Sequence, residues 1–213
     1  MKANIINLKK RIDRWDYITT AWKNAPFELK QIEAKPNPNI FHGVFLEHRE
    51  LLDIAHKNKE EFLLIMEDDA EPQADWETRW KHILKYLHEN DDWDLFNGGI
   101  HDVQDKFNKV VKLKDEGITT YLLDVQRGAA SHFVYMRVET CLEKLKCWEE
   151  EGKPDFDGWY CSKLRTKACV PFIATQKDDY SDNAKDTRIW SDIFRHSQDL
   201  LMLRAFRMFQ SNV

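Results

Sequence analysis

Two spacings of apolar residues alternate along the chain, one typical of strands and one typical of helices. Apolar or β-branched runs predict strands at residues 3–8, 27–34, 62–66, 94–98, 110–113, 119–125, 131–136 and 168–174. Apolar residues recur with helical period over about 9–22, 43–58, 75–88, 137–151 and 189–209. Because strands and helices interleave, the pattern predicts an α/β sandwich with a central, mainly parallel mixed sheet.

The apolar run Phe62–Met66 is the most informative of these strands, because it ends directly in Glu67, Asp68 and Asp69. In open α/β sheets the ligand crevice lies beyond the carboxyl ends of the strands, and carboxylate oxygens there suit a hard divalent cation. An acidic turn that caps the following helix is the plainer interpretation, and it is the commoner one for an arbitrary sequence. The two tryptophans of the 75–88 segment, Trp76 and Trp80, are expected in the core.

Length and charge indicate a single-domain protein that does not bind nucleic acid. The 213 residues suit a single domain over 1–213, and the net charge of −5 comes with scattered lysines and arginines, which predicts no nucleic-acid partner. No run is long enough to span a membrane and no signal-peptide pattern is present, so a soluble, cytoplasmic protein is expected. The final helix, about 187–210, has no stop signal before Val213, as expected of a chain that leads into a further domain or of a frayed end.

The cysteine pattern argues against a C-x-x-C site, and the glycine pattern argues against a glycine-rich loop that binds phosphate. The four cysteines form no C-x-x-C pair, so reduced and partly buried thiols are expected. Among the seven glycines there is neither a G-x-G-x-x-G nor a G-x-x-x-x-G-K-S/T motif. A bound phosphate would therefore be held by a metal ion or by side chains.

A basic turn follows the first predicted strand and offers such side chains. Asn7 and Leu8 stand at the strand end, and Arg11 and Arg14 follow shortly after them in the sequence. Arginine forks match phosphate oxygens, although solvated surface charge is the plainer interpretation of an isolated basic turn.

Several segments, in one order, resemble the nucleotide-sugar-dependent glycosyltransferases of the GT-A fold, and in particular the lipopolysaccharide-type family 25. Residues 5–15 (IINLKKRIDRW) resemble the I-N-L-x-x-R-x-D-R start of that family, and residues 63–72 (LLIMEDDAEP) resemble its L-I-L-E-D-D-V strand. Residues 43–48 are similar to its G-C-x-x-S-H helix start, with Val44 and Glu47 departing from it. Further matches follow in order at 94–99, 131–135, 156–157, 170–171 and 176. The sequence as a whole also resembles the N-terminal domain of chlorella-virus glycosyltransferases that act on capsid glycans.

The resemblance implies a GT-A-type α/β/α sandwich that transfers a sugar from a nucleotide diphosphate sugar, a UDP-sugar in the first instance, with inversion. The acceptor it implies is a glycan or glycoprotein, a viral capsid protein among the candidates, and a viral enzyme of this kind would act in the host cytoplasm. It implies a cofactor, Mn²⁺ or Mg²⁺, held by Asp69 with Asp68 beside it, and both ions prefer oxygen ligands. The nucleotide sugar is expected on six residues: Asn7, Leu8, Arg11, Arg14, Glu67 and Asp68.

Asp157 is the predicted general base, since the family has an acid at this point, before a short helix. An inverting single displacement needs a carboxylate that takes the proton of the acceptor hydroxyl as the new bond forms. Asp155 is the rival for this role, and a helix cap is the plainer role for Asp157. Trp159 is expected to stack on a sugar face, and Gly158 to let the backbone approach.

The segment 176–182 is polar and is predicted as a loop that orders over the donor, with an ordinary surface connection as the alternative. Other classes of protein remain beside the glycosyltransferase. A non-catalytic nucleotide-sugar-binding module stays open. A metal-dependent phosphohydrolase would need a nucleophilic Asp with a Lys/Ser partner pattern, which is not found, and a receiver-like domain would be shorter.

Overall fold

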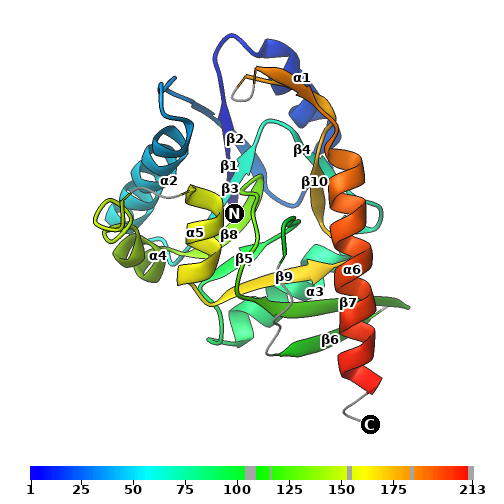
Figure 1. Cartoon of the computed structure of the whole chain (residues 1–213). Coiled ribbons are helices and arrows are strands. Elements are labelled where there is room, and N and C mark those ends of the chain that lie inside the picture. The colour runs from blue at the N-terminus through cyan, green and yellow to red at the C-terminus, as the bar shows by residue number, and fades with distance from the viewer. Residues whose placement is uncertain (104–108, 116, 153–154, 183–184, 211–213) are drawn as a thin grey trace.

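The computed structural model describes residues 1–103, 109–115, 117–152, 155–182 and 185–210. Val213, on which the expectation of a further domain depends, lies outside these ranges. Within them, a central sheet is covered by helices on both faces (Figure 1). The strands of this sheet are, in spatial order, β2 (Glu28–Glu33), β1 (Lys2–Asn7), β3 (Phe62–Glu67), β8 (Phe133–Arg137), β5 (Leu95–Asn97), β9 (Thr166–Val170), β7 (Ile118–Val125) and β6 (Val110–Asp115).

The sheet is mixed, and most of its strands run in one direction. β2, β1 and β3 are mutually parallel, and β5 and β9 are parallel to each other. β8 runs antiparallel to both β3 and β5, and β7 runs antiparallel to β9 and β6. The α/β sandwich with a mainly parallel mixed sheet that the hydrophobic pattern predicts is therefore confirmed.

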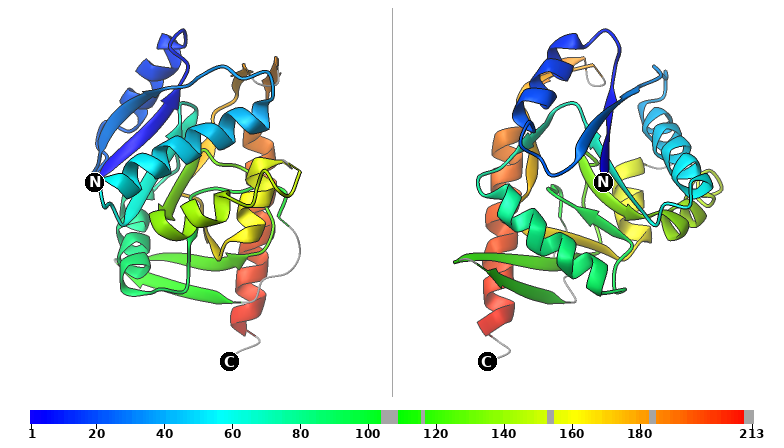
Figure 2. Two further views of the ribbon diagram at one scale, coloured as in Figure 1. Left: turned by 90° about the vertical axis from the view of Figure 1, so that its left-hand side faces the viewer. Right: turned by 180° about the vertical axis from the view of Figure 1, so that it is seen from behind.

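Helices form a layer on each face of the sheet (Figure 2), and alternating residues of the strands pack against the two layers. On β3, Leu64 and Met66 pack into the cluster that includes the two helices of one face, α1 (Ile12–Ala21) and α3 (Trp76–Glu89). Leu63 and Ile65 point to the other face. That face is covered by α2 (Ile40–Lys57), α4 (Val138–Leu145), α5 (Phe156–Lys163) and α6 (Trp190–Gln210). Burying each large apolar side chain of this kind contributes about 1.5–3 kcal/mol, so β3 is anchored from both sides.

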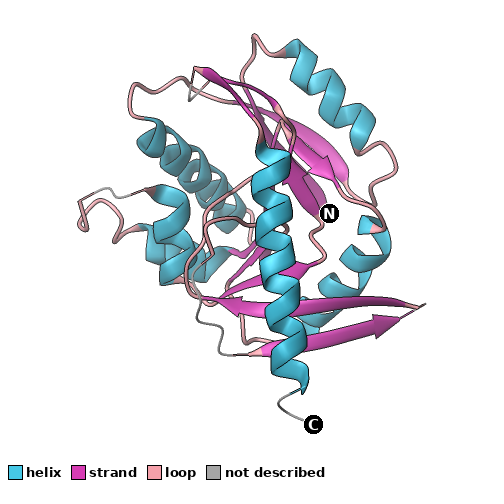
Figure 3. Cartoon of the chain, turned by 45° about the vertical axis from the view of Figure 1, so that its right-hand side comes forward, coloured by secondary structure: helices cyan, strands magenta, loops and turns pink. Residues whose placement is uncertain are grey.

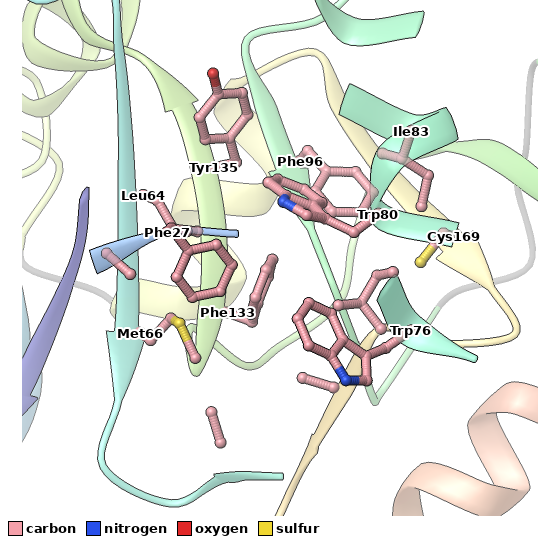
Figure 4. Packing of buried hydrophobic residues seen from close by; sticks show 14 of the residues in the cluster. Phe27, Leu64, Met66, Trp76, Trp80, Ile83, Phe96, Phe133, Tyr135 and Cys169 are labelled. Carbon is pink, nitrogen blue, oxygen red and sulfur yellow. The ribbon is translucent and has the colours of Figure 1, made fainter. Parts of the chain in front are cut away.

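Aromatic rings fill the core under α3. Trp76 and Trp80 are both buried, as expected, and Trp80 meets Phe133 of β8 edge-on at 5.4 Å (Figure 4). The indole of Trp22, which stacks on Phe133 at 5.5 Å, donates a hydrogen bond from Nε1 to the carbonyl of Ala70 at 2.8 Å. This core thus fixes the backbone directly after the acidic triplet.

Two segments differ from the sequence prediction. Residues 168–174 do not form one strand: β9 ends at Val170, since Pro171 has no N–H for the ladder, and a separate strand, β10 (Ala174–Gln176), pairs with β4 (Ala70–Pro72). Gly99 makes room for β10, because a Cβ there would come within 1.9 Å of the Ala174 carbonyl oxygen. The predicted loop over 176–182 also holds β11 (Asp179–Ser181), which pairs with β12 (Asp186–Arg188).

The predicted helix over 137–151 is shorter than expected. α4 ends at Leu145, and the next amides bond three residues back, Lys146 to Glu143 and Cys147 to Lys144, which tightens the chain into turns. α6 crosses β9, β7 and β6, so its last turn lies near the β6 edge of the sheet and far from β11 and β12 (Figure 3). No helix of the described ranges is both long and apolar enough to cross a membrane. Three of the four free cysteines are buried and Cys147 is exposed.

Candidate functional site

The carboxyl ends of β1 and β3 lie side by side, because the two strands are parallel and Ile6 pairs with Glu67. Asn7, the last residue of β1, is buried and donates from Nδ2 to Asp68 Oδ2 at 2.7 Å. Its own Oδ1 accepts a hydrogen bond from Gln31 of β2 at 2.8 Å. Adjacent parallel strands therefore bring the predicted Asn7 and the acidic triplet together, as the sequence pattern requires. We refer to Glu67, Asp68, Asp69 and Asp157 as the acidic edge.

Asp69 is not the cap of a helix. The chain continues from Asp69 into β4, and α3 begins only at Trp76. Asp69 is buried, and its carbonyl accepts a hydrogen bond from the Lys177 amide at 2.8 Å. Its Oδ2 lies 3.4 Å from Arg14 Nη1, whereas its Oδ1 accepts no hydrogen bond from the described residues. Burial raises the pKa of Asp69 and the charge of the neighbouring Asp68 adds to that effect, whereas the positive charge of Arg14 and the nearby Gln176 side chain oppose it.

Arg14 and Arg11 extend from the first turn of α1 and its N-cap to the same edge. Arg14 donates from Nη1 to Asp68 Oδ1 at 2.8 Å and from Nη2 to the Tyr180 carbonyl at 2.8 Å. Arg11 donates to Asp182 Oδ2 at 2.7 Å and also pairs with Asp13. Arg14 thus contacts the acidic edge directly, and Arg11 lies next to it with other carboxylates, Asp13, Asp179 and Asp182, as partners.

Leu8 also lies at this edge, half-buried directly after β1. Its carbonyl accepts a hydrogen bond from the Arg11 amide at 2.8 Å, which closes the tight turn into α1.

Glu67 contacts the segment that directly precedes β8. Its Oε1 accepts a hydrogen bond from the Ser131 hydroxyl at 2.6 Å, and its amide donates to the His132 carbonyl at 3.0 Å. Burial raises the pKa of Glu67, and the charges of Asp69 and Asp157 raise it further. These carboxylates therefore crowd one another electrostatically.

Ser131 has no role in the sequence prediction, although it belongs to the motif at 131–135. It follows Ala130, which has a φ of +104°, a backbone conformation that L residues rarely adopt. Asn97 holds this strained turn by donating from Nδ2 to the Ala130 carbonyl at 2.5 Å. Strain of this kind persists where surrounding contacts over-determine it, and here it aims the Ser131 hydroxyl at Glu67.

Asp155 and Asp157 at the start of α5 have different partners. Asp155 is the helix cap, because it accepts a hydrogen bond from the Gly158 amide at 3.0 Å. The plainer role for Asp157, the cap, is therefore wrong. Asp157 is half-buried in the first turn. Burial and then the charge of Asp155 raise its pKa to about 6, and the neighbouring Ser131 side chain and Ala130 backbone act in the opposite direction.

The expectation that Trp159 stacks on a sugar is wrong. Trp159 is buried in the α2–α4–α5 cluster and donates from Nε1 to Glu151 Oε2 at 2.9 Å. Gly158 serves the cap, since a Cβ there would lie 2.8 Å from Asp155 Oδ2.

The segment 176–182 lies over the arginines. β10 pairs with β4 directly after the acidic triplet, and β11 carries Asp179 and Tyr180 to Arg14 and Arg11. The expectation of an irregular loop is wrong here, because backbone pairing and ion pairs order the segment. Its closure over a donor stays a prediction.

In the described ranges no three His, Cys, Asp or Glu side chains are arranged as a ready cation site. A cation at the acidic edge would thus need ligands from a substrate or from water in addition to the protein's own carboxylates. Hard cations in phosphate-binding sites are commonly held in this way, by one or two carboxylates plus phosphate oxygens.

Comparisons with known proteins give weak likenesses only. No family model matches the sequence, and no curated protein does. Among solved structures, A197 from STIV overlaps with a TM-score of 0.48 at 17% identity, over 83% of this chain and 86% of that one.

A glycosyltransferase involved in glycosylation of the major capsid of PBCV-1 gives a TM-score of 0.42 at 10% identity, over 72% of this chain and 68% of that one. A mutant UDP-glucose pyrophosphorylase from Leishmania major in complex with UDP-glucose gives 0.31 at 12%, over 72% and 42%. At such scores none of these likenesses says what this chain does.

Proposed function

We propose that this chain is a GT-A-type glycosyltransferase that uses a divalent cation and transfers a sugar from a nucleotide diphosphate sugar to an acceptor hydroxyl. The observation that carries the proposal is the buried Asp69 carboxylate at the carboxyl edge of the sheet, whose Oδ1 accepts no hydrogen bond of good geometry from the described residues, with the Gln176 side chain as its further polar neighbour. The ordered motifs that resemble family 25 support the same function.

The residues present fit an oxygen-preferring cation such as Mn²⁺ or Mg²⁺. A buried carboxylate oxygen without a partner costs about 1–3 kcal/mol or more, and a cation beside it removes that cost. Asp69 would supply that oxygen, and Asp68 lies next to it with Arg14 and Asn7 as its present partners. When bound, the cation would neutralise the charge that grows on the diphosphate leaving group.

The donor's nucleotide is proposed on the β1 side of the edge. Asn7 and Leu8 would meet the base or ribose, and Glu67 and Asp68 the ribose or bound water. Arg11 and Arg14 would contact the phosphates.

The two arginines already bind oxygens of Asp182, Asp68 and the Tyr180 carbonyl, so their forks are pre-oriented for acceptors of hydrogen bonds. Diphosphate oxygens would exchange with these partners rather than require a new arginine geometry.

Asp157 is proposed as the general base. It would take the proton of the acceptor hydroxyl while that oxygen bonds to the anomeric carbon and the bond to the diphosphate oxygen breaks, which inverts the configuration. With a pKa of about 6, Asp157 is mostly ionised at pH 7 and still basic enough to accept a proton. Asp155 is occupied as a helix cap, which favours Asp157 over its rival. A glycan or glycoprotein is the acceptor class proposed.

The test is a thermal-shift panel of UDP-glucose, UDP-galactose, UDP-N-acetylglucosamine and GDP-mannose, each with Mn²⁺, with Mg²⁺ and with EDTA. A ligand at 100 times its Kd stabilises the native state by about 2.7 kcal/mol, which is about 5–10 °C for a chain of this size.

We expect one nucleotide class to raise Tm in Mn²⁺ and to have little effect in EDTA. If no nucleotide shifts Tm, the proposal fails. If a nucleotide sugar binds with the ion but no sugar is transferred to any glycan or to water, the chain is a binding module instead.

A further inference from the structure

Phe41 stands on the core-facing side of α2 and is nevertheless exposed. Phe41, Phe45, His48 and Leu52 recur at helical spacing and so share one face of the helix. Phe45, His48 and Leu52 are 1%, 0% and 0% exposed, whereas Phe41 is 47% exposed. The inward face of α2 therefore continues one turn beyond the elements that cover it.

The exposed turn lies at the end of α5 that carries Asp157. Phe45 contacts Phe156 with ring centroids 6.0 Å apart, and His48, further along α2, contacts both Phe156 and Tyr160 at 5.2 and 6.1 Å. Moving toward the start of α2 thus means moving toward the start of α5, and the two helices lie side by side (Figure 1).

Phe41 is one turn, about 6 Å along the axis, beyond Phe45. It therefore lies on the part of α2 that leads toward the start of α5, where Asp157 directly follows Phe156.

We propose that Phe41 is the platform on which the acceptor's sugar ring stacks, so that a ring hydroxyl reaches Asp157. The inference rests on the proposed function and adds the acceptor subsite to it. The apolar C–H face of a pyranose covers an aromatic ring well, and binding pockets for such ligands combine aromatic walls with a few polar groups. Trp159, which the sequence suggested for this role, is buried and cannot fill it.

A second exposed aromatic side chain among the described residues lies on the opposite side of the acidic edge. Tyr180 is 46% exposed on β11, and its carbonyl accepts hydrogen bonds from Arg14 and Arg11, the proposed phosphate contacts. Tyr180 therefore belongs to the donor side and Phe41 to the acceptor side, with the acidic edge between them.

Saturation-transfer NMR tests the inference with a panel of methyl pyranosides (glucoside, galactoside, mannoside, fucoside and xyloside). The protein is loaded with UDP and Mg²⁺, and UDP binding is measured separately by calorimetry. We expect ring protons of one sugar face to receive saturation in the wild type. Loss of a stacking ring in Phe41→Ala should weaken that pyranoside by about 3- to 10-fold, and Phe41→Trp should restore it.

Leu46→Ala is the matched control, because Leu46 is 42% exposed on the opposite side of the same helix. Unchanged sugar binding in Phe41→Ala, an equal loss in Leu46→Ala, or no pyranoside signal in a wild type that binds UDP would each overturn the inference and leave the proposed function intact. A wild type that does not bind UDP with Mg²⁺ or Mn²⁺ would instead contradict the proposed function.

Discussion

At the scale of single residues, the two acids at the start of α5 have different roles. Asp155 caps the helix, and Asp157 is the proposed general base. Asp155 satisfies the Gly158 amide, whereas Asp157 lies beside Ser131 and the Ala130 backbone and adds its charge to the field at Glu67. The two can therefore be removed one at a time with different consequences.

Asp157→Asn is expected to lower turnover by about 10²-fold or more, because the amide keeps the size of the side chain but cannot take a proton. Donor binding should be retained, since Asp157 is not among the proposed donor contacts. The measurements are UDP release in the presence of acceptor and UDP affinity by calorimetry.

The control is Asp155→Ala, which should lose about 1 kcal/mol of unfolding free energy with its cap and keep most of the turnover. Near-normal turnover of Asp157→Asn, or a product that retains the donor's anomeric configuration, would show that another group acts as the base.

The sequence locates the acidic triplet together with Asn7 and Arg14, but it does not resolve the roles of Asp155, Asp157 and Ser131. Phe62–Met66 followed by three acids is a strong local pattern, so the location of Asp69 at a strand end follows from period alone. Whether Asp155 or Asp157 caps α5 depends on the exact residue at which the helix begins, and no periodic pattern in the sequence specifies that residue. The contact between Ser131 and Glu67 spans 64 residues and depends on an antiparallel β8 beside β3.

At the scale of elements, α2 carries a buried histidine that links stability to pH. His48 is fully buried against the rings of Phe156 and Tyr160, and neither ring nitrogen has a hydrogen-bond partner among the described residues. Burial lowers its pKa from 6.5 to about 4. Between these pH values His48 is protonated in the unfolded chain and neutral in the folded chain. The free energy of unfolding therefore decreases as the pH falls from about 6.5 to about 4.

His48→Leu should remove this pH-dependent loss of stability, because leucine cannot be protonated. Between pH 7 and pH 5 the free energy of unfolding of the wild type should fall by about 2 kcal/mol more than that of the variant. Urea unfolding of both proteins at the two pH values measures the difference and cancels the contribution of the carboxylates. Parallel pH profiles would mean that His48 is protonated in the folded state.

The β11–β12 hairpin is held to α1 by ion pairs. Asp182 accepts hydrogen bonds from Lys10 at 2.5 Å and from Arg11 at 2.7 Å. Asp182→Asn should weaken this contact by the small amount typical of partly exposed pairs, and backbone exchange in residues 179–182 should rise by about 2- to 5-fold.

Asp192→Asn, which removes an exposed pair with Arg195 on α6, is the control for hydrogen exchange by mass spectrometry. UDP with Mn²⁺ should slow exchange in the same peptide of the wild type if the hairpin closes on the donor. Exchange that is indifferent to both the substitution and the ligand would rule out a hairpin that opens.

Elements with a clear period were predicted to within a few residues, and those made by tertiary pairing were not. The Phe45–His48–Leu52 spacing identifies α2, and the alternation on β3 reflects two packed faces. β4, β10 and β11 are three residues each and exist because distant segments pair, so their sequences carry too little pattern to reveal them.

At the scale of the whole molecule, the sheet gathers segments far apart in the sequence at one edge. β1 contributes Asn7, β3 the acidic triplet, the turn before β8 Ser131, and α5 Asp157. The arginines of the α1 segment are fewer than the carboxylates that surround them, so the edge has an excess of negative charge. The divalent cation that we propose would offset this excess of negative charge.

The central claim is that Asp69 holds a cation that in turn holds a nucleotide diphosphate. Calorimetric titration of UDP into wild type and Asp69→Asn, each in Mn²⁺ and in EDTA, tests it most directly. We expect the wild type to bind UDP at least about 10-fold more tightly in Mn²⁺, and the variant to bind equally weakly in both, while its Tm without ligand is unchanged or higher because a buried charge is gone. Equal, Mn²⁺-dependent UDP binding by both proteins would contradict the account.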